Sequence, residues 1–209
     1  MKEESQQILS QNEVKFYCTR AAVGAGAPFG LAEEFAKWAV WFGCSGLDLA
    51  PICVSVLNNL DQGRSDLHGE IYQKPQQLRL CSNSKTTLSA IQAGCFVTDW
   101  LSEHDDTDER LVIEDTDSPF LLTAAVGTTP SKACSISWGN PSCLINFDSN
   151  KNWELLWNGE NPPELSGPSK VILSMNPDIS NSVDLGSRQT FHFQDSREKT
   201  LNQGISVGK

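Results

Sequence analysis

The feature that most constrains the fold is a long apolar run near the N-terminus that is interrupted by its own residues. From Trp38 to Leu57 the sequence holds 20 residues and a single charged side chain, Asp48. A run of this length would allow one helix to cross a membrane. The middle of the run, however, contains residues that break a continuous helix, namely Gly43, Ser45, Gly46, Asp48 and Pro51. The run therefore predicts two short buried helices joined by a turn, and no membrane span.

Three helices are predicted for the N-terminal part of the chain, where we expect a helical lobe over residues 8–63. Ser10 and Glu13 have the spacing of a capping box, in which each side chain binds the backbone amide of the other residue, so they begin the first helix. The second helix is expected over about 30–42, and the third over about 48–63, because glycine and proline separate the apolar stripes of these segments.

The middle of the chain, residues 64–118, is expected to combine one helix with loops. Residues 64–85 are polar and predict mostly loop, whereas the apolar spacing in 87–102 fits a helix. Eight carboxylates and one arginine lie between Glu103 and Asp117. This stretch lacks the glycine and the glutamate that a calcium-binding loop needs at its sixth and twelfth positions, so it predicts a solvated acidic loop 103–117.

Alternating apolar and polar residues dominate residues 119–195, and they predict an antiparallel meander. The alternating runs are 119–127, 132–138, 142–148, 152–158, 170–175 and 189–194. The clearest hairpin turns its apolar residues to one face, which the next strand continues: Cys134, Ile136, Trp138, Cys143, Ile145, Phe147, Trp153, Leu155 and Trp157. Helices followed by strands predict an α+β fold, with an N-terminal helical lobe packed on a C-terminal antiparallel sheet. We expect residues 1–209 to form one domain that ends in a tail, 196–209.

The charge of the chain limits its partners. The 16 lysines and arginines against 26 aspartates and glutamates give a formal net charge of −10 and a pI near 4.7. Binding to phosphate backbones needs clustered basic residues, so we expect no nucleic-acid partner and no anionic membrane surface.

The cysteines and the first residues predict a cellular location. The seven cysteines include no Cys-x-x-Cys pair, and residues 1–13 are polar and acidic. We therefore expect no signal peptide, free thiols in a reducing cytoplasm, and no bound metal ion or cofactor.

Few motifs in the sequence carry chemistry. The glycine-rich segment 24–30 resembles a phosphate-binding loop, but a helix precedes it, so a turn between two helices explains it better. Anion binding at the start of the second helix stays open. Cys95 is the cysteine that is least easily dismissed as a nucleophile, and His192 faces either solvent or a pocket. The sequence contains none of the motifs Gly-x-Ser-x-Gly, His-Glu-x-x-His and Ser-x-x-Lys.

Two segments resemble a known family. Residues 10–38 contain Ser10-Gln-Asn-Glu13, Arg20-Ala-Ala-Val-Gly-Ala-Gly26, Gly30-Leu-Ala-Glu-Glu34 and Trp38. Near the other end stand Thr190-Phe-His-Phe193 and Ser196-Arg197, followed by Gly204 and Gly208. Together they resemble a bacterial family of about this length that is known only as a domain of unknown function. The family's closing Gly-Ala-Gly-Ala-Gly run is represented here only by Gln203–Gly208. The resemblance implies a bacterial, cytoplasmic protein and no particular activity.

Two classes of function follow from these observations. The first is a non-catalytic binding or accessory component that takes a protein partner or a small ligand. The alternative is a small-molecule enzyme with its site between the helical lobe and the sheet. Charged residues within or beside apolar segments give the candidate ligand-binding residues, which are Arg20, Glu34, Asp99, Ser196 and Arg197. In particular, the tail could fold back over the helices and bring Arg197 near Glu34. The oligomeric state is left open.

Overall fold

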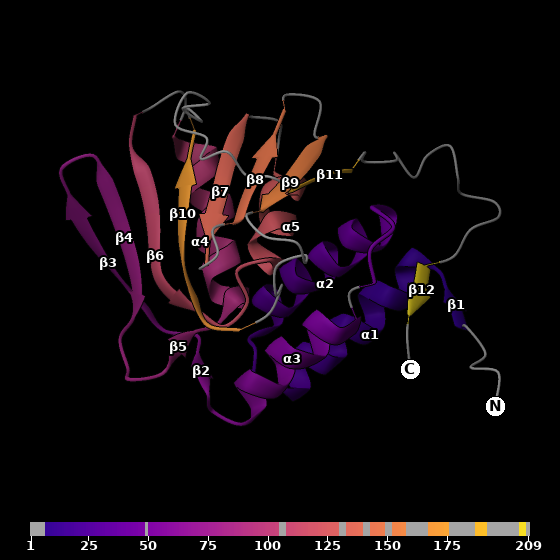
Figure 1. Cartoon of the computed structure of the whole chain (residues 1–209). Coiled ribbons are helices and arrows are strands. Elements are labelled where there is room, and N and C mark those ends of the chain that lie inside the picture. Colours follow the sequence, from indigo (N-terminus) through magenta and orange to yellow (C-terminus); the bar gives the residue numbers. More distant parts are fainter. Residues whose placement is uncertain are drawn as a thin grey trace.

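Three helices fill the N-terminal part of the chain, as the glycines and prolines predict (Figure 1). The computed structural model describes residues 7–48, 50–104, 108–129, 133–139, 143–148, 152–157, 167–175, 187–191 and 205–207. The helices are α1 (Gln11–Gly24), α2 (Phe29–Cys44) and α3 (Ala50–Asp61). The predicted capping box is present, because the Ser10 hydroxyl accepts from the Glu13 amide and the Glu13 carboxylate accepts from the Ser10 amide.

The apolar run from Trp38 to Leu57 is divided between α2 and α3, as predicted. Helix α2 ends at Cys44, and the chain turns at Gly46, whose φ of 76° is a left-handed conformation that favours glycine. Asp48 then accepts a hydrogen bond from the Ala50 amide at 3.0 Å and begins α3. Among the described residues, no helix is both long and apolar enough to cross a membrane.

The strands of the described residues form one large mixed sheet and a separate two-stranded pair. The large sheet contains β2 (Ser65–Asp66), β3 (Gly69–Lys74), β4 (Gln77–Ser82), β5 (Thr87–Leu88), β6 (Arg110–Thr116), β7 (Cys134–Trp138), β8 (Cys143–Phe147), β9 (Trp153–Trp157), β10 (Ser169–Ser174) and β11 (Ser187–Phe191). Its main order is β11-β9-β8-β7-β10-β6-β4-β3, with β5 beside β6 and β2 beside β5. The fold class α+β is thus confirmed, whereas the pure antiparallel meander is wrong.

Two features separate the sheet from a meander. Strand β10 returns between β7 and β6, so it interrupts the order of the hairpins. In addition, β6 runs parallel to β4 and β5, and helix α4 (Ala90–Glu103) connects β5 to β6. A parallel pair needs such a crossover, because a short turn cannot return the chain to the same end of the sheet. The predicted 87–102 helix is this crossover.

Three predicted segments have a different structure. Residues 64–85 are mainly strands β2, β3 and β4, and every residue of β3 is exposed, so no apolar alternation marked it. The run 119–127 belongs mainly to helix α5 (Leu121–Thr128), which is buried on nearly all sides. A short apolar run fits a buried helix as well as a buried strand. The proposed acidic loop 103–117 contains β6, whose Leu111–Ile113 segment is buried.

The core lies between the sheet and helices α2, α4 and α5 (Figure 1). The predicted hairpin is present, with Ile136 opposite Ile145, and its apolar residues are buried as expected. Aromatic rings from the helices meet those of the strands. Phe42 stacks on Phe120 at 5.2 Å between ring centres, and Trp41 lies 5.9 Å from Trp153. These two ring contacts join α2 to the start of α5 and to strand β9 of the sheet.

The C-terminal tail returns to the helices. Strand β12 (Ile205–Val207) pairs antiparallel with β1 (Gln7–Leu9), directly before α1, and it also contacts α2. The fold-back that the sequence analysis considered is therefore present for these three residues. Arg197 itself lies outside the described residues.

Candidate functional site

A buried carboxylate, that of Asp117, marks the strongest candidate site. Asp117 directly follows β6, and its backbone amide donates to the Leu88 carbonyl at 3.2 Å, which extends the pairing of β6 with β5. Its side-chain Oδ1 accepts from the Ala90 amide at 2.8 Å. Asp117 therefore caps the N-terminus of α4, next to the helix's own cap residue, Ser89. Only 1% of Asp117 is exposed.

Several buried polar atoms of Asp117 and of residues near it have no hydrogen-bond partner among the described residues. The Asp117 Oδ2 atom and the hydroxyls of Ser65, Thr116 and Ser118 are buried and form no hydrogen bond in the part of the chain that the structure describes. The side chains of Ser65 and Asn59 approach the carboxylate closely enough to lower its pKa, although Oδ2 lacks a partner in good hydrogen-bond geometry. We call this group the Asp117 corner: Asn59, Ser65, Ser89, Thr116, Asp117 and Ser118.

The electrostatics of the corner bring the Asp117 carboxyl close to neutral pH. Burial raises the pKa of Asp117 to about 6, against the hydrogen bond from the Ala90 amide and the nearby polar side chains of Ser65 and Asn59, which lower it. Desolvation disfavours the charged form more than these donors stabilise it. A carboxyl of this kind can exchange a proton near pH 6, and once ionised it is a strong acceptor with one unused oxygen. The corner is therefore suited to bind a group that carries hydrogen-bond donors.

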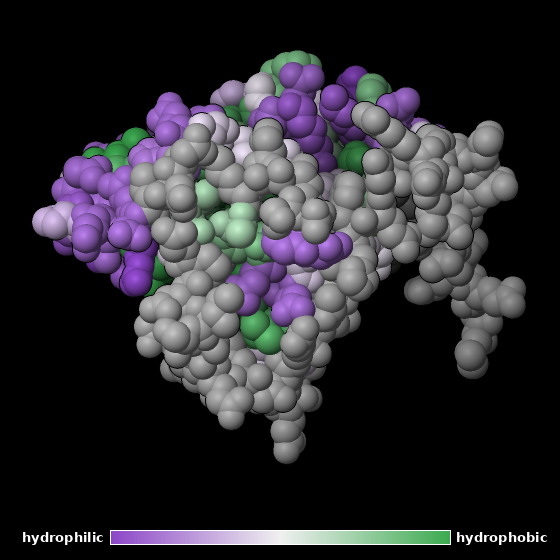
Figure 2. Space-filling model, turned by 90° about the horizontal axis from the view of Figure 1, so that it is seen from above, coloured by the Kyte–Doolittle hydropathy of each residue, from purple (hydrophilic) through white to green (hydrophobic). Residues whose placement is uncertain are grey.

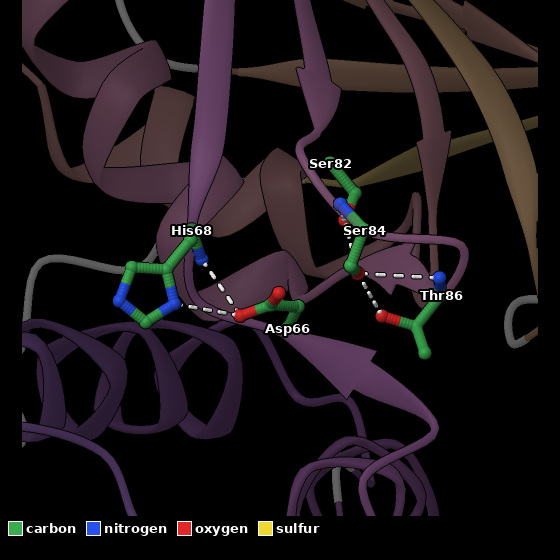
Figure 3. A network of polar contacts seen from close by, with 5 residues as sticks. All are labelled: Asp66, His68, Ser82, Ser84 and Thr86. Carbon is green, nitrogen blue, oxygen red and sulfur yellow. Dashed lines mark hydrogen bonds and ion pairs between the residues drawn. The ribbon is translucent and has the colours of Figure 1, made fainter.

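A second polar network lies at the surface beside the corner (Figure 3). Asp66, which follows Ser65, accepts at Oδ1 from the His68 backbone amide at 3.0 Å and lies 2.8 Å from His68 Nδ1. Hydrogen bonds from His68, and a smaller one from Ser84, lower the pKa of Asp66. The Ser84 hydroxyl in turn lies 2.6 Å from that of Thr86.

This surface network has the residue types of a catalytic triad in a different arrangement. A triad needs the imidazole between the carboxylate and the nucleophilic hydroxyl. Here Asp66 lies between His68 and Ser84, and Figure 3 shows the His68 ring pointing away from Ser84. The His68 side chain is also 76% exposed. The network therefore orders the turn after β2, as aspartate side chains commonly do, and does not activate a serine.

Three of the five residues that the sequence analysis proposed as a ligand site lie in the described part of the chain. Arg20 is exposed on α1, with its guanidinium carbon 5.4 Å from the centre of the Phe16 ring. Glu34 on α2 forms an ion pair with Lys37 at 2.5 Å, and Asp99 on α4 is exposed. Ser196 and Arg197 lie outside the described residues. A ligand role for any of these residues stays a proposal.

Glu34 and Asp99 do come together around one of the cysteines. Burial, with smaller contributions from the negative charges of Glu34 and Asp99, raises the pKa of Cys95 to about 12. A nucleophilic cysteine needs the opposite surroundings, because a positive neighbour favours the thiolate. These surroundings disfavour the thiolate form of Cys95, so we expect a thiol of low reactivity. His192, the other residue left open, lies outside the described residues.

The Asp117 corner was not predicted from the sequence, because Asp117 is the last residue of the acidic stretch 103–117. A signal was available in the apolar segment Leu111-Val112-Ile113, which indicates a buried strand that ends just before Asp117.

No group of three or more His, Cys, Asp or Glu side chains that could hold a metal ion occurs among the described residues.

Comparison with known proteins adds a family match and a fold. Residues 9–66 match the family described as "Protein of unknown function (DUF3726)". This match covers the N-terminal motif noted in the sequence and ends well before the tail motif, for which the resemblance stays a prediction. No curated protein matches the chain.

Solved structures share the fold at very low sequence identity. The malate dehydrogenase from Pyrococcus horikoshii OT3 is 10% identical, with a TM-score of 0.57 over 74% of this chain and 51% of that chain. A dehydrogenase from Sinorhizobium meliloti is 8% identical, with a TM-score of 0.57 over 87% and 82%. The sulfolactate dehydrogenase from Methanocaldococcus jannaschii is 10% identical, with a TM-score of 0.50 over 82% and 78%. The chain spans about half the length of the malate dehydrogenases that it matches. The likeness concerns the fold alone.

Proposed function

We propose that this protein is a binding component whose ligand is a small molecule with an amine, held in its ammonium form at the Asp117 corner. The observation that carries this proposal is the buried Oδ2 atom of Asp117, which has no partner in good hydrogen-bond geometry among the described residues, with the Ser65 side chain beside the carboxylate. Buried polar groups in folded proteins nearly always have partners, so a group of orphans indicates a site that something else completes.

An ammonium group fits the chemistry of the corner. It brings up to three N–H donors, of which one can bind the free carboxylate oxygen and another the hydroxyl oxygen of Ser65. Its positive charge would stabilise the ionised form of Asp117, which burial disfavours. The net charge of −10 also attracts cations to the protein surface. Because Asp117 is buried, only a small head group would fit beside Oδ2.

A dehydrogenase is the second candidate, since the fold is shared with enzymes named for malate and sulfolactate. A carboxyl with a pKa of about 6 can act as a general acid or base near neutral pH, and the corner lies between helices and sheet. Ionised Asp117 would, however, repel an anionic acid such as malate or sulfolactate. We therefore rank amine binding above dehydrogenation of these acids.

The proposal is tested by titrating the protein with methylammonium, with ethanolamine and, as the anionic control, with malate. The NMR signal of the Ala90 amide reports on the site, because this amide donates to Asp117. We expect a saturable shift with the amines, stronger above pH 6 than below it. Asp117→Asn should abolish the shift, whereas Asp115→Asn, at an exposed residue of β6, should preserve it.

Two results would overturn the proposal. One is an Ala90 signal that no amine moves, and the other is a shift that survives in Asp117→Asn. Saturable binding of malate at the corner, accompanied by reduction of an added electron-accepting dye, would favour the dehydrogenase instead.

A further inference from the structure

The outer edge of the large sheet is formed by β3, the strand farthest from α1 (Figure 1). One side of β3 pairs with β4, and the other side faces no strand in the described part of the sheet. All six residues of β3 are exposed, including two large apolar ones, Ile71 at 54% and Tyr72 at 49%. Figure 2 shows hydrophilic residues with apolar ones among them at this end of the molecule. An exposed edge with apolar side chains is a template for another strand.

The turn between β3 and β4 determines which backbone groups face the open edge. Lys74 and Gln77 are directly opposite each other across a two-residue turn, so they form the hydrogen-bonded pair that closes the hairpin. Hydrogen-bonded and non-hydrogen-bonded pairs alternate along an antiparallel ladder. The amides and carbonyls of Gly69, Ile71 and Gln73 therefore point away from β4, toward the open edge.

We propose that β3 pairs with β3 of a second copy of this chain, antiparallel and across a twofold axis at Tyr72. In this register Ile71 of each copy pairs with Gln73 of the other, and these residues carry the free backbone groups. Glu70 of each copy then stands opposite Lys74 of the other, on the face that also carries Tyr72. The interface thus contains two opposite-charge pairs around a central pair of tyrosines, and both types of cross-strand pair stabilise a sheet.

The charges of β3 also discriminate against other arrangements. Charged residues on an edge strand normally prevent pairing, because most partners leave the charges unmatched. If the register between the two copies of β3 were shifted by two residues, Lys74 would stand opposite Tyr72 and Glu70 would lie beyond the paired segment. A second copy in the proposed register is the partner in which Glu70 and Lys74 are both matched at once. The segment is short, so we expect a dimer that dissociates on dilution.

Charge exchange at two positions tests this interface. Sedimentation velocity over a series of concentrations should show a monomer–dimer equilibrium for the unaltered chain. Glu70→Lys or Lys74→Glu alone places like charges opposite each other, and each should weaken dimerisation roughly tenfold or more. The double variant Glu70→Lys/Lys74→Glu restores opposite charges and should dimerise again.

Mixing the two single variants gives the decisive result. The Glu70→Lys variant has a positive side chain at both positions, 70 and 74, and the Lys74→Glu variant has a negative side chain at both. The mixture should therefore form a heterodimer, although neither variant dimerises alone. Both side chains are exposed, so circular dichroism and thermal unfolding should confirm that the variants are folded. Ile71→Pro, which removes one edge amide, should also give a monomer.

Three outcomes would overturn the proposal. The first is an unaltered chain that stays monomeric at every accessible concentration. The second is a dimer that Lys74→Glu does not weaken, because such a dimer uses another surface. The third is a mixture of the two single variants that stays monomeric.

Discussion

Gly94 of α4 lies directly against the indole ring of Trp38 of α2. A Cβ atom at position 94 would stand 2.4 Å from Trp38 Cη2 and 2.8 Å from Cζ3, which is closer than two carbon atoms can approach. Trp38 itself is fully buried. The absence of a side chain at Gly94 therefore sets how closely α2 and α4 pack.

The first prediction concerns this contact. Gly94→Ala should lower the free energy of unfolding by about 1–3 kcal/mol, because the added methyl group must displace a ring that the core holds on all sides. Urea denaturation followed by tryptophan fluorescence measures the change. The matched control is Gly30→Ala in α2, where an added Cβ meets nothing within 4 Å, so stability should stay the same or rise slightly. Equal losses in both variants would show that the Trp38 contact is not the cause.

The sequence was most informative where local chemistry decides the structure. The capping box at Ser10, the break between α2 and α3 within the apolar run, and the alternation in the hairpin around Ile136 each depend on neighbours within a few residues. All three were predicted correctly. These features follow from hydrogen bonding and side-chain periodicity that a short segment contains in itself.

The sequence was least informative where distant segments decide the structure. Strand β3 exists because β4 pairs with it, and its own residues are all exposed. The insertion of β10 between β7 and β6 leaves no mark on any one of these strands. The Asp117 corner likewise depends on α3, β2 and α4 meeting at the end of β6. Its carboxylate therefore looked like one more surface charge.

The second prediction concerns the thiols. A hydrogen bond from Cys53 on α3 lowers the pKa of Cys18 on α1, whereas burial raises that of Cys95 to about 12. The thiolate is the reactive form, so iodoacetamide should label Cys18 well before Cys95. Peptide mass spectrometry over a time course measures both rates.

A matched pair of alanine variants identifies the cause of this reactivity. Cys53→Ala removes the hydrogen-bond donor and should slow labelling of Cys18 several-fold, because less of it is thiolate. Cys44→Ala serves as the control, because it also removes a thiol but Cys44 is not a partner of Cys18. Labelling of Cys18 that is unchanged by Cys53→Ala would contradict the prediction.

The third prediction concerns the start of α1. Ser10→Ala removes the acceptor for the Glu13 amide and one partner of the Glu13 carboxylate, so it should destabilise the protein by about 1 kcal/mol. Thr19→Ala is the control, because the Thr19 hydroxyl binds the Lys15 carbonyl, which the helix already uses. Thermal unfolding of both variants separates the two effects. Ser10→Ala should unfold at a lower temperature than Thr19→Ala, and the reverse order would contradict the role of the cap.

The fourth prediction concerns the dependence of stability on pH. The pKa of Asp117 is about 6 in the folded chain, against an ordinary value of 3.8, which applies to the unfolded chain. The folded state therefore holds the carboxyl proton more tightly than the unfolded state. As the pH rises from about 4 to 6, the unfolded chain releases the proton first, and the contribution of Asp117 to stability falls. Each pKa unit corresponds to about 1.4 kcal/mol, so the loss amounts to about 3 kcal/mol and is complete above pH 6.

Asp117→Asn isolates this contribution, because asparagine keeps an oxygen for the Ala90 amide and cannot ionise. The variant should lack the fall in stability between pH 4 and 6, and it should be more stable than the unaltered chain at pH 7. Urea unfolding of both proteins at several pH values gives the difference, in which the titrations of other groups such as Asp66 cancel.

Asp117→Ala separates charge from capping, because it leaves the Ala90 amide without an acceptor in the core. It should therefore be less stable than Asp117→Asn at every pH. If instead Asp117→Asn showed the same pH dependence as the unaltered chain, the buried carboxyl would not be the titrating group, and the electrostatic basis of the Asp117 corner would be wrong.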